Sequence, residues 1–268
     1  MRIFKYWQRA RGEVLIDGKE KSISCYGGSN HSESDALADG HRRLEAVKRR
    51  IAGIDKERPP DYEGDIREEL IESIGSEDAI TRNRYGAEVL NSTSCVFVDI
   101  DEPVFRLWQI FRRFRSTAQK KQAILEFLER RLRKPDLNGF GIRIYETHNG
   151  VRLLLTGKAM NPRSPESRKL LRSFNADFLY ATLCRKQNCY RARLTPKPHR
   201  IKMKPIRLKY PYEENDRERI DAWVGEYNSR CEAFATCRLV KKAGVDFDSL
   251  AVRCHDGRTK AQSNLPLA

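Results

Sequence analysis

Two observations predict an α+β protein: the order of segments from residue 94, and a ββα pattern at the N-terminus. From residue 94 the segments follow the order strand, helix, strand, strand, helix, strand. This is the order of the split βαβ motif, so we expect a ferredoxin-like, or RRM-like, core. An N-terminal ββα pattern precedes the core and a helical extension follows it. The predicted divisions are 1–58 for the N-terminal module, 61–212 for the core and 213–268 for the extension.

The N-terminal module is predicted from two strand-like stretches and one helix-like stretch. Residues 2–10 and 12–26 have strand patterns, and Asp17-Gly18 is a hairpin turn signal. Ser32 or Ser34 is expected to cap a helix that runs to about Ile51.

Within the core, the split βαβ order is expected to begin with a strand at 94–101, followed by a helix over 104–133 with a break at Ser116-Thr117. Residues 140–147 then alternate as a strand, with Ile142 and Ile144 inward and Arg143 and Tyr145 outward. Asn149-Gly150 forms a turn to a return strand at 151–156. The remaining expected elements are helices at 164–174, 177–185 and 216–231, strands at 188–195 and 236–240, and a polar tail from residue 255.

The charge balance indicates a polyanionic partner. The 268-residue chain carries 52 Lys and Arg against 37 Asp and Glu, for a net charge of +15. A protein this basic most often meets nucleic acid. No apolar run reaches the length of a membrane span, so we expect no membrane association.

The cysteines indicate a reducing, cytoplasmic setting with free thiols. There are seven, an odd number, scattered along the chain, and the N-terminus has no secretory signal pattern. The spacings Cys184-x4-Cys189 and Cys231-x5-Cys237 are looser than a zinc knuckle, which argues against zinc.

The central candidate site is the acid pair that ends the apolar run Cys95-Val96-Phe97-Val98. Asp99 and Asp101 are two residues apart, so on a strand they share one side. Two neighbouring carboxylates repel each other unless a cation lies between them, and Mg²⁺ or Mn²⁺ would serve. The alternative is that the pair caps a helix starting at Pro103.

A second candidate lies in the turn and strand that follow. In a split βαβ sheet the first and third strands are neighbours, which brings Arg152 towards Asp99 and Asp101. Together with Thr147 and His148 in the preceding turn, Arg152 is a candidate to hold nucleotide phosphates. The alternative is a structural ion pair between Arg152 and an aspartate.

The third candidate is a basic tract. From residue 178 to 212 there are ten Lys or Arg and no acid. Phosphate contact explains such a tract better than a solvated surface does. The candidate nucleic-acid-binding residues are Arg191, Arg193, Lys197 and Arg200.

Residues 94–200 resemble the archaeo-eukaryotic primase superfamily, which includes primase-polymerase domains. The apolar strand ending in Asp99-Ile100-Asp101 matches the metal-binding acid pair of that family. Gly150-Val151-Arg152 matches the position of its phosphate-contacting element, with Arg in place of His. The resemblance implies metal-dependent nucleotidyl transfer, with Asp99 and Asp101 as catalytic and metal-binding residues. Its partners would be nucleotides and DNA or RNA, single-stranded or as a primer–template.

Two other classes remain open from the sequence. One is a non-catalytic nucleic-acid-binding protein on the same fold. The other is a phosphatase, because the stretch ending in Asp99 and Asp101 is also similar to the first motif of haloacid-dehalogenase-type enzymes, in which the first Asp is a nucleophile.

Overall fold

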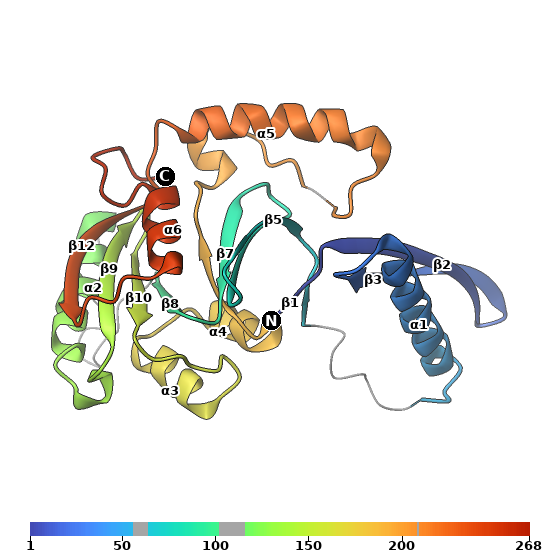
Figure 1. Cartoon of the computed structure of the whole chain (residues 1–268), viewed down its shortest axis with the longest axis horizontal. Coiled ribbons are helices and arrows are strands. Elements are labelled where there is room, and N and C mark those ends of the chain that lie inside the picture. The colour runs from blue at the N-terminus through green and yellow to red at the C-terminus, as the bar shows by residue number, and fades with distance from the viewer. Residues whose placement is uncertain (56–63, 102–115, 208) are drawn as a thin grey trace.

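The computed structural model describes residues 1–55, 64–101, 116–207 and 209–268. They form an α+β protein built from several small sheets and helices. The N-terminal module stands to one side of a larger body that holds the two four-stranded sheets (Figure 1). Within the described residues, no helix combines the length and the apolar character needed to span a membrane.

The N-terminal module confirms the predicted ββα pattern. Strands β2 (Tyr6–Ile16) and β3 (Lys19–Ser29) pair antiparallel, and Asp17 and Gly18 turn the chain with positive φ angles of 52° and 73°. Helix α1 (Glu33–Ile51) begins at Ser32, whose side chain accepts a hydrogen bond from the backbone N–H of Asp35. Ala10, Cys25 and Leu44 form its small core.

The sheet that carries the acid pair has the order β12-β9-β10-β8. Its members are β8 (Val96–Ile100), β9 (Gly141–Thr147), β10 (Val151–Thr156) and β12 (Cys237–Gly244), and every pairing is antiparallel. The predicted turn at Asn149-Gly150 joins β9 and β10. The expected neighbours, β8 and β10, are indeed paired.

The expected outward position of Arg143 and Tyr145 on β9 is wrong, because both are buried. Helix α6 (Leu250–Thr259) supplies Asp256, which accepts hydrogen bonds from Arg143 and from the Tyr145 hydroxyl at 2.9 and 2.6 Å. A sheet covered on both faces loses the inside–outside alternation that a one-sided sheet shows.

The second sheet has the order β11-β7-β6-β5. It contains β5 (Glu69–Ile74), β6 (Asp78–Arg82), β7 (Glu88–Ser92) and β11 (Tyr190–Arg193), and the short strands β1 (Arg2–Ile3) and β4 (Asp65–Ile66) pair beside it. In a ferredoxin-like sheet β11 would pair with β8, but here it pairs with β7. Only residues 93–95 separate β7 from β8, so the chain passes from one sheet to the other there and leaves the edge of β7 for β11.

Helices cover these sheets. Their bounds are α2 (Thr117–Arg131), α3 (Pro165–Ser173), α4 (Phe178–Gln187) and α5 (Arg217–Cys231), with 3-10 turns at Pro135–Leu137, Pro198–Ile201 and Glu214–Asp216. Ser116 caps α2 as expected, through the backbone N–H of Gln119. The first part of the predicted helix, 104–115, lies outside the described residues, and so does the proposed cap at Pro103.

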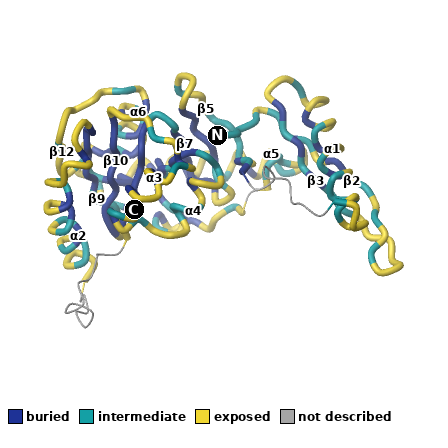
Figure 2. The backbone as a smooth tube through the Cα atoms, turned by 90° about the horizontal axis from the view of Figure 1, so that it is seen from below, coloured by how far each residue is buried: buried dark blue, intermediate teal, exposed yellow. Residues whose placement is uncertain are grey.

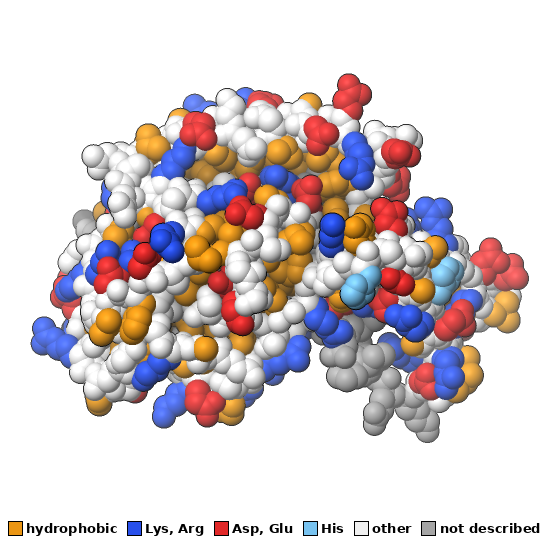
Figure 3. All heavy atoms as spheres, in the orientation of Figure 1, with side chains coloured by type: hydrophobic (Ala, Val, Ile, Leu, Met, Phe, Trp, Pro, Cys, Tyr) orange, Lys and Arg blue, Asp and Glu red, His pale blue; other side chains and the backbone are white. Residues whose placement is uncertain are grey.

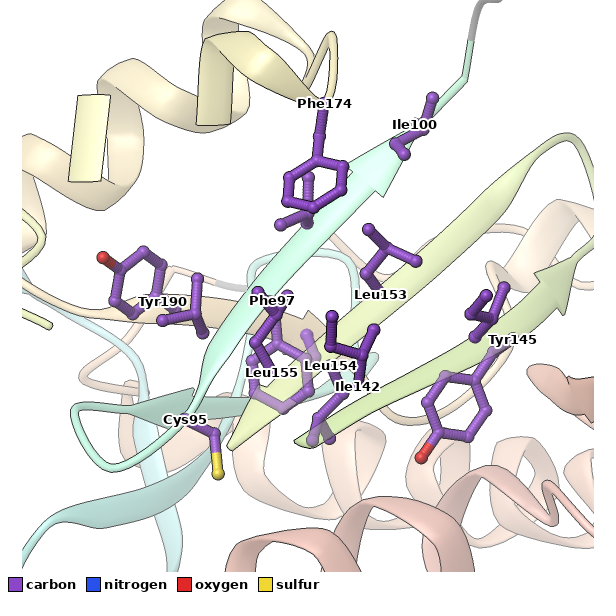
Figure 4. Packing of buried hydrophobic residues seen from close by; sticks show 14 of the residues in the cluster. Cys95, Phe97, Ile100, Ile142, Tyr145, Leu153, Leu154, Leu155, Phe174 and Tyr190 are labelled. Carbon is purple, nitrogen blue, oxygen red and sulfur yellow. The ribbon is translucent and has the colours of Figure 1, made fainter. Parts of the chain in front are cut away.

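The main core lies where the two sheets meet. Phe97 on β8 and Leu153, Leu154 and Leu155 on β10 are fully buried, and Tyr190 of β11 lies beside them (Figure 4). Strands β6, β7 and β10 are buried along their whole length, whereas the β2–β3 hairpin is largely exposed towards its tip (Figure 2). The acid-bearing strand β8 is part of this main core.

The C-terminal part belongs to this core, in contrast to the expected polar tail. His255 is fully buried in α6, and Ala261 and Ala268 are buried after it. The backbone of Ala235 bridges to Leu267. The polar residues of this segment gave no sign that an apolar stripe of α6 packs on the sheet.

Candidate functional site

Strand pairing places Asp99 directly opposite Arg152. Strand β8 is apolar on both faces up to Val98, so it is anchored between the covering helices and presents its C-terminal end, with Asp99 and Asp101, at the rim of the sheet. The pairing register therefore sets the first contact of the site, and the predicted approach of Arg152 to the acid pair is confirmed.

Asp99 and Arg152 form a two-pronged ion pair. Arg152 Nε and Nη2 donate to the two carboxylate oxygens of Asp99 at 2.7 and 3.2 Å. Arg152 is buried, with 2% of its side chain exposed, whereas Asp99 keeps 31%. Burial alone disfavours the carboxylate, but the charge and hydrogen bonds of Arg152 outweigh it and lower the pKa of Asp99. The ion pair expected as the structural alternative is thus present.

Arg152 is held from two further sides. Its Nη1 donates to the backbone carbonyl of Arg193 at 2.9 Å and lies 3.5 Å from Nε2 of His255. The other ring nitrogen of His255 lies 3.0 Å from the Asp256 carboxylate. His255 therefore belongs to the shell around the site, although the sequence pattern had placed it at the start of a polar tail.

A small cavity of about 140 Å³ opens beside the ion pair. It joins the predicted acid pair to part of the predicted basic tract. Its lining consists of Asp99, Asp101, Thr147, Asn149, Val151, Arg152, Arg193, Lys197, Arg200 and Thr236. We call it the acid–base pocket. Asn149 was expected only as a turn residue, and no signal in the sequence singled out Thr236.

Three cations of the pocket have no ion-pair partner among the described residues: Arg193, Lys197 and Arg200. Burial and repulsion from Arg152 lower the pKa of Arg193 to about 10. Burial, followed by the charges of Arg193 and Arg200, also lowers the pKa of Lys197. The pocket thus holds positive charges at an electrostatic cost that a bound anion would offset.

Two residues predicted to belong to the site, Arg191 and His148, do not line the acid–base pocket. Arg191 donates to Glu68 at 2.5 Å and to Gln187 at 3.0 Å, so it joins a side-chain network outside the pocket. Nδ1 of His148 lies 2.9 Å from the carbonyl oxygen of Leu267. The basic tract therefore divides into a part that lines the pocket and a part that is paired elsewhere.

Asp101 is the less neutralised acid of the pair. Partial burial and repulsion from Asp99 raise its pKa, and the charge of Asp177 adds to this effect. Asp177 lies close by, because its backbone N–H donates to the carbonyl of Asp99 at 3.4 Å. Its carboxylate caps α4 through the N–H of Tyr180 at 2.7 Å. The local structure thus assigns Asp177 to the helix cap.

A divalent cation would find two carboxylates here. Among the residues that the structure describes, no group of three or more His, Cys, Asp or Glu side chains is placed to hold a metal. Asp101 and the oxygen lone pairs of Asp99 not used by Arg152 are the oxygens that the pocket offers. One or two carboxylates suffice for Mg²⁺ when water and substrate phosphates supply the other ligands. All seven cysteines are free.

On the face shown in the space-filling view, basic and acidic side chains are interspersed (Figure 3). Comparison with family models, with curated proteins and with solved structures finds no match to this chain. The chemistry of the acid–base pocket is therefore the basis for proposing a function.

Proposed function

We propose that the protein binds nucleic acid or nucleotides through phosphate groups in the acid–base pocket. The observation that carries this is the surplus of cations: four basic side chains face two acids, and Arg152 already neutralises Asp99. Phosphate is the common anion for which guanidinium groups provide matching donors. The net charge of +15 supports a polyanionic partner.

The size of the pocket points to phosphates rather than a whole nucleotide inside it. Pockets that enclose a small-molecule ligand usually measure about 300–1,000 Å³. At about 140 Å³, the acid–base pocket suits a phosphate, with sugar and base outside its mouth. A strand lying across the opening would meet this requirement, and so would the phosphate tail of a nucleotide.

The test is binding of a labelled single-stranded DNA or RNA across a salt series. Changing Arg193, Lys197 and Arg200 to Gln should weaken binding and flatten the dependence of log K on log salt by about 0.7 per lost phosphate contact. The matched control changes three exposed cations outside the pocket, Arg133, Lys134 and Lys21, to Gln.

Both triple variants lose the same net charge, so a general charge effect would alter them equally. Equal losses in the two variants would refute the pocket as the binding site. Absence of binding by the unchanged protein at low salt would refute the proposed function. Thermal melting of each variant confirms that it is folded.

A second candidate function is metal-dependent nucleotidyl transfer of the primase-polymerase kind. The observation that favours it is the acid pair itself: Asp101 and Asp99 lie together at the end of β8, and the pKa of Asp101 is raised. Mg²⁺ or Mn²⁺ bound there would stabilise negative charge that develops on phosphate oxygens. The part of this chain would be to hold the cation through the acid pair and the phosphates through Arg193, Lys197 and Arg200.

Asp101→Asn separates the two candidates. A binding protein should keep its affinity for a strand or gain some, because a repulsive charge is removed. A nucleotidyltransferase should lose template-directed extension in Mg²⁺ or Mn²⁺. Undiminished extension by both Asp99→Asn and Asp101→Asn would rule out the acid pair as a metal site. A phosphatase would instead hydrolyse a small phosphate ester and lose that activity in Asp99→Asn.

A further inference from the structure

A second groove lies between helices α3 and α4, outside the acid–base pocket. It encloses about 230 Å³. Helix α4 presents large apolar side chains to solvent: Phe178, which lines the groove, is 78% exposed, and Leu179 and Leu183 of the same helix are 71% and 44% exposed. Exposed apolar side chains that gather on one element mark an interaction surface more often than isolated ones do.

The groove is also basic. Arg168 and Arg172 of α3 and Arg185 of α4 line it, and each is exposed. None of these arginines forms an ion pair with another described residue, and none of the described residues lining the groove is acidic. Its chemistry therefore combines an exposed aromatic ring with three uncompensated guanidinium groups.

Asp177 ties the start of α4 to the strand that carries the acid pair. This residue immediately precedes Phe178, and its backbone N–H donates to the carbonyl of Asp99 at 3.4 Å. The exposed ring of Phe178 therefore follows directly after a residue bonded to the strand that carries the acid pair.

We propose that the α3–α4 groove is a second contact surface for a single nucleic-acid strand, with a base stacked on Phe178 and phosphates on Arg168, Arg172 and Arg185. This inference rests on the proposed function. Aromatic rings with arginines are the elements by which proteins hold single strands without reading their sequence. Charge complementarity selects this partner, because a polyanion satisfies all three arginines at once.

The experiment replaces the ring of Phe178 in graded steps and measures strand binding. Phe178→Ala should weaken binding of a single strand about fivefold or more, which corresponds to one lost base stack. Phe178→Trp should retain the affinity, whereas Phe178→Leu should lose it, because Leu keeps the apolar surface without the aromatic face. Leu15→Ala, at the exposed hairpin tip, is the control and should leave binding unchanged.

Ligand length separates this inference from the proposed function. A mononucleotide should bind the Phe178 variants as well as the unchanged protein, because only the acid–base pocket holds it. Strand binding that is unaffected in all Phe178 variants would overturn the groove while leaving the pocket standing. Retained strand affinity in Phe178→Leu, together with binding of an acidic apolar peptide, would overturn it in favour of a protein partner. Loss of binding only in the Arg193, Lys197 and Arg200 variant would likewise confine the site to the pocket.

Discussion

Replacing Asp99 by Asn tests the ion pair on which the candidate site is built. The change keeps the shape of the side chain and removes its charge. Arg152 would then remain as a buried cation, since 2% of its side chain is exposed and its other close donor contact is the carbonyl of Arg193. A buried charge that loses its partner retains the full cost of leaving water.

The expected loss of folding free energy in Asp99→Asn follows from the exposure of Asp99 and Arg152. Breaking a buried ion pair by removing one side costs about 3–5 kcal/mol. Asp99 is 31% exposed, so water already screens the pair and we expect the lower end, about 3 kcal/mol. For a protein of this size, a loss of about 3 kcal/mol lowers the melting temperature by roughly 6–12 °C.

The assay is urea unfolding, with thermal melting alongside. Arg152→Met should lower the free energy of unfolding less than Asp99→Asn does, because the exposed part of the Asp99 carboxylate reaches water once Arg152 is gone. Glu226→Gln, which breaks a surface pair with Arg230 on α5, is the control and should cost less than about 0.5 kcal/mol. A melting temperature in Asp99→Asn equal to that of the unchanged protein would refute this account of the pair.

The same pair predicts a pH dependence. The pKa of Asp99 is lower in the folded protein than in the unfolded chain, so the unfolded chain binds the proton more readily. The stability that the pair contributes is therefore complete above about pH 4, the ordinary range of an Asp carboxyl, and is lost as the pH falls through the folded-state pKa. The difference in stability between the unchanged protein and Asp99→Asn should shrink over that acid range; a difference independent of pH would contradict the assignment.

Three further predictions concern the stability of the fold, at residues that do not line the acid–base pocket. Burial lowers the pKa of His255, so stability should fall as the pH drops below about 6.5, and urea midpoints at pH 5 and pH 7.5 should lie closer together in His255→Gln. Gly86 has a φ of 93°, and an added Cβ would lie 2.2 Å from the ring of Trp223, so Gly86→Ala should destabilise by about 2 kcal/mol or more in thermal melting. Leu154→Ala should cost about 2–5 kcal/mol in urea, because Leu154 is fully buried in the main core; a smaller loss would show that the core collapses around the gap.

Local sequence signals determined several elements without any need for tertiary contacts. Asp17-Gly18 turns the chain where expected because both residues adopt the positive φ angles that such a turn requires, and the chain also turns as expected at Asn149-Gly150. Ser32 and Ser116 begin helices because their side chains satisfy free N–H groups of the first turn. The apolar run before Asp99 identified the buried strand β8, because a continuous apolar run is typical of a strand covered on both faces.

The tertiary structure decided which strands pair and which elements cover the faces of the sheets. The order of elements predicted the neighbours β8 and β10, and so the approach of Arg152 to Asp99, but not that β11 would join β7. Alternation predicted an exposed Tyr145, and only the packing of α6 shows why it is buried. Period-2 patterns report which side of a strand is apolar and carry no information about the element that covers the other side.

The sequence by itself determined the chemical content of the candidate site: an acid pair at the end of a buried strand, a basic turn and a basic tract. Only the tertiary structure decided which of these residues meet. It brings Arg193, Lys197 and Arg200 to the acid pair, and it directs Arg191, two residues from Arg193, to Glu68. The physical reason is that a side chain's partners are set by the segments folded against it, and those segments can be distant in the chain: Glu68 lies 123 residues before Arg191.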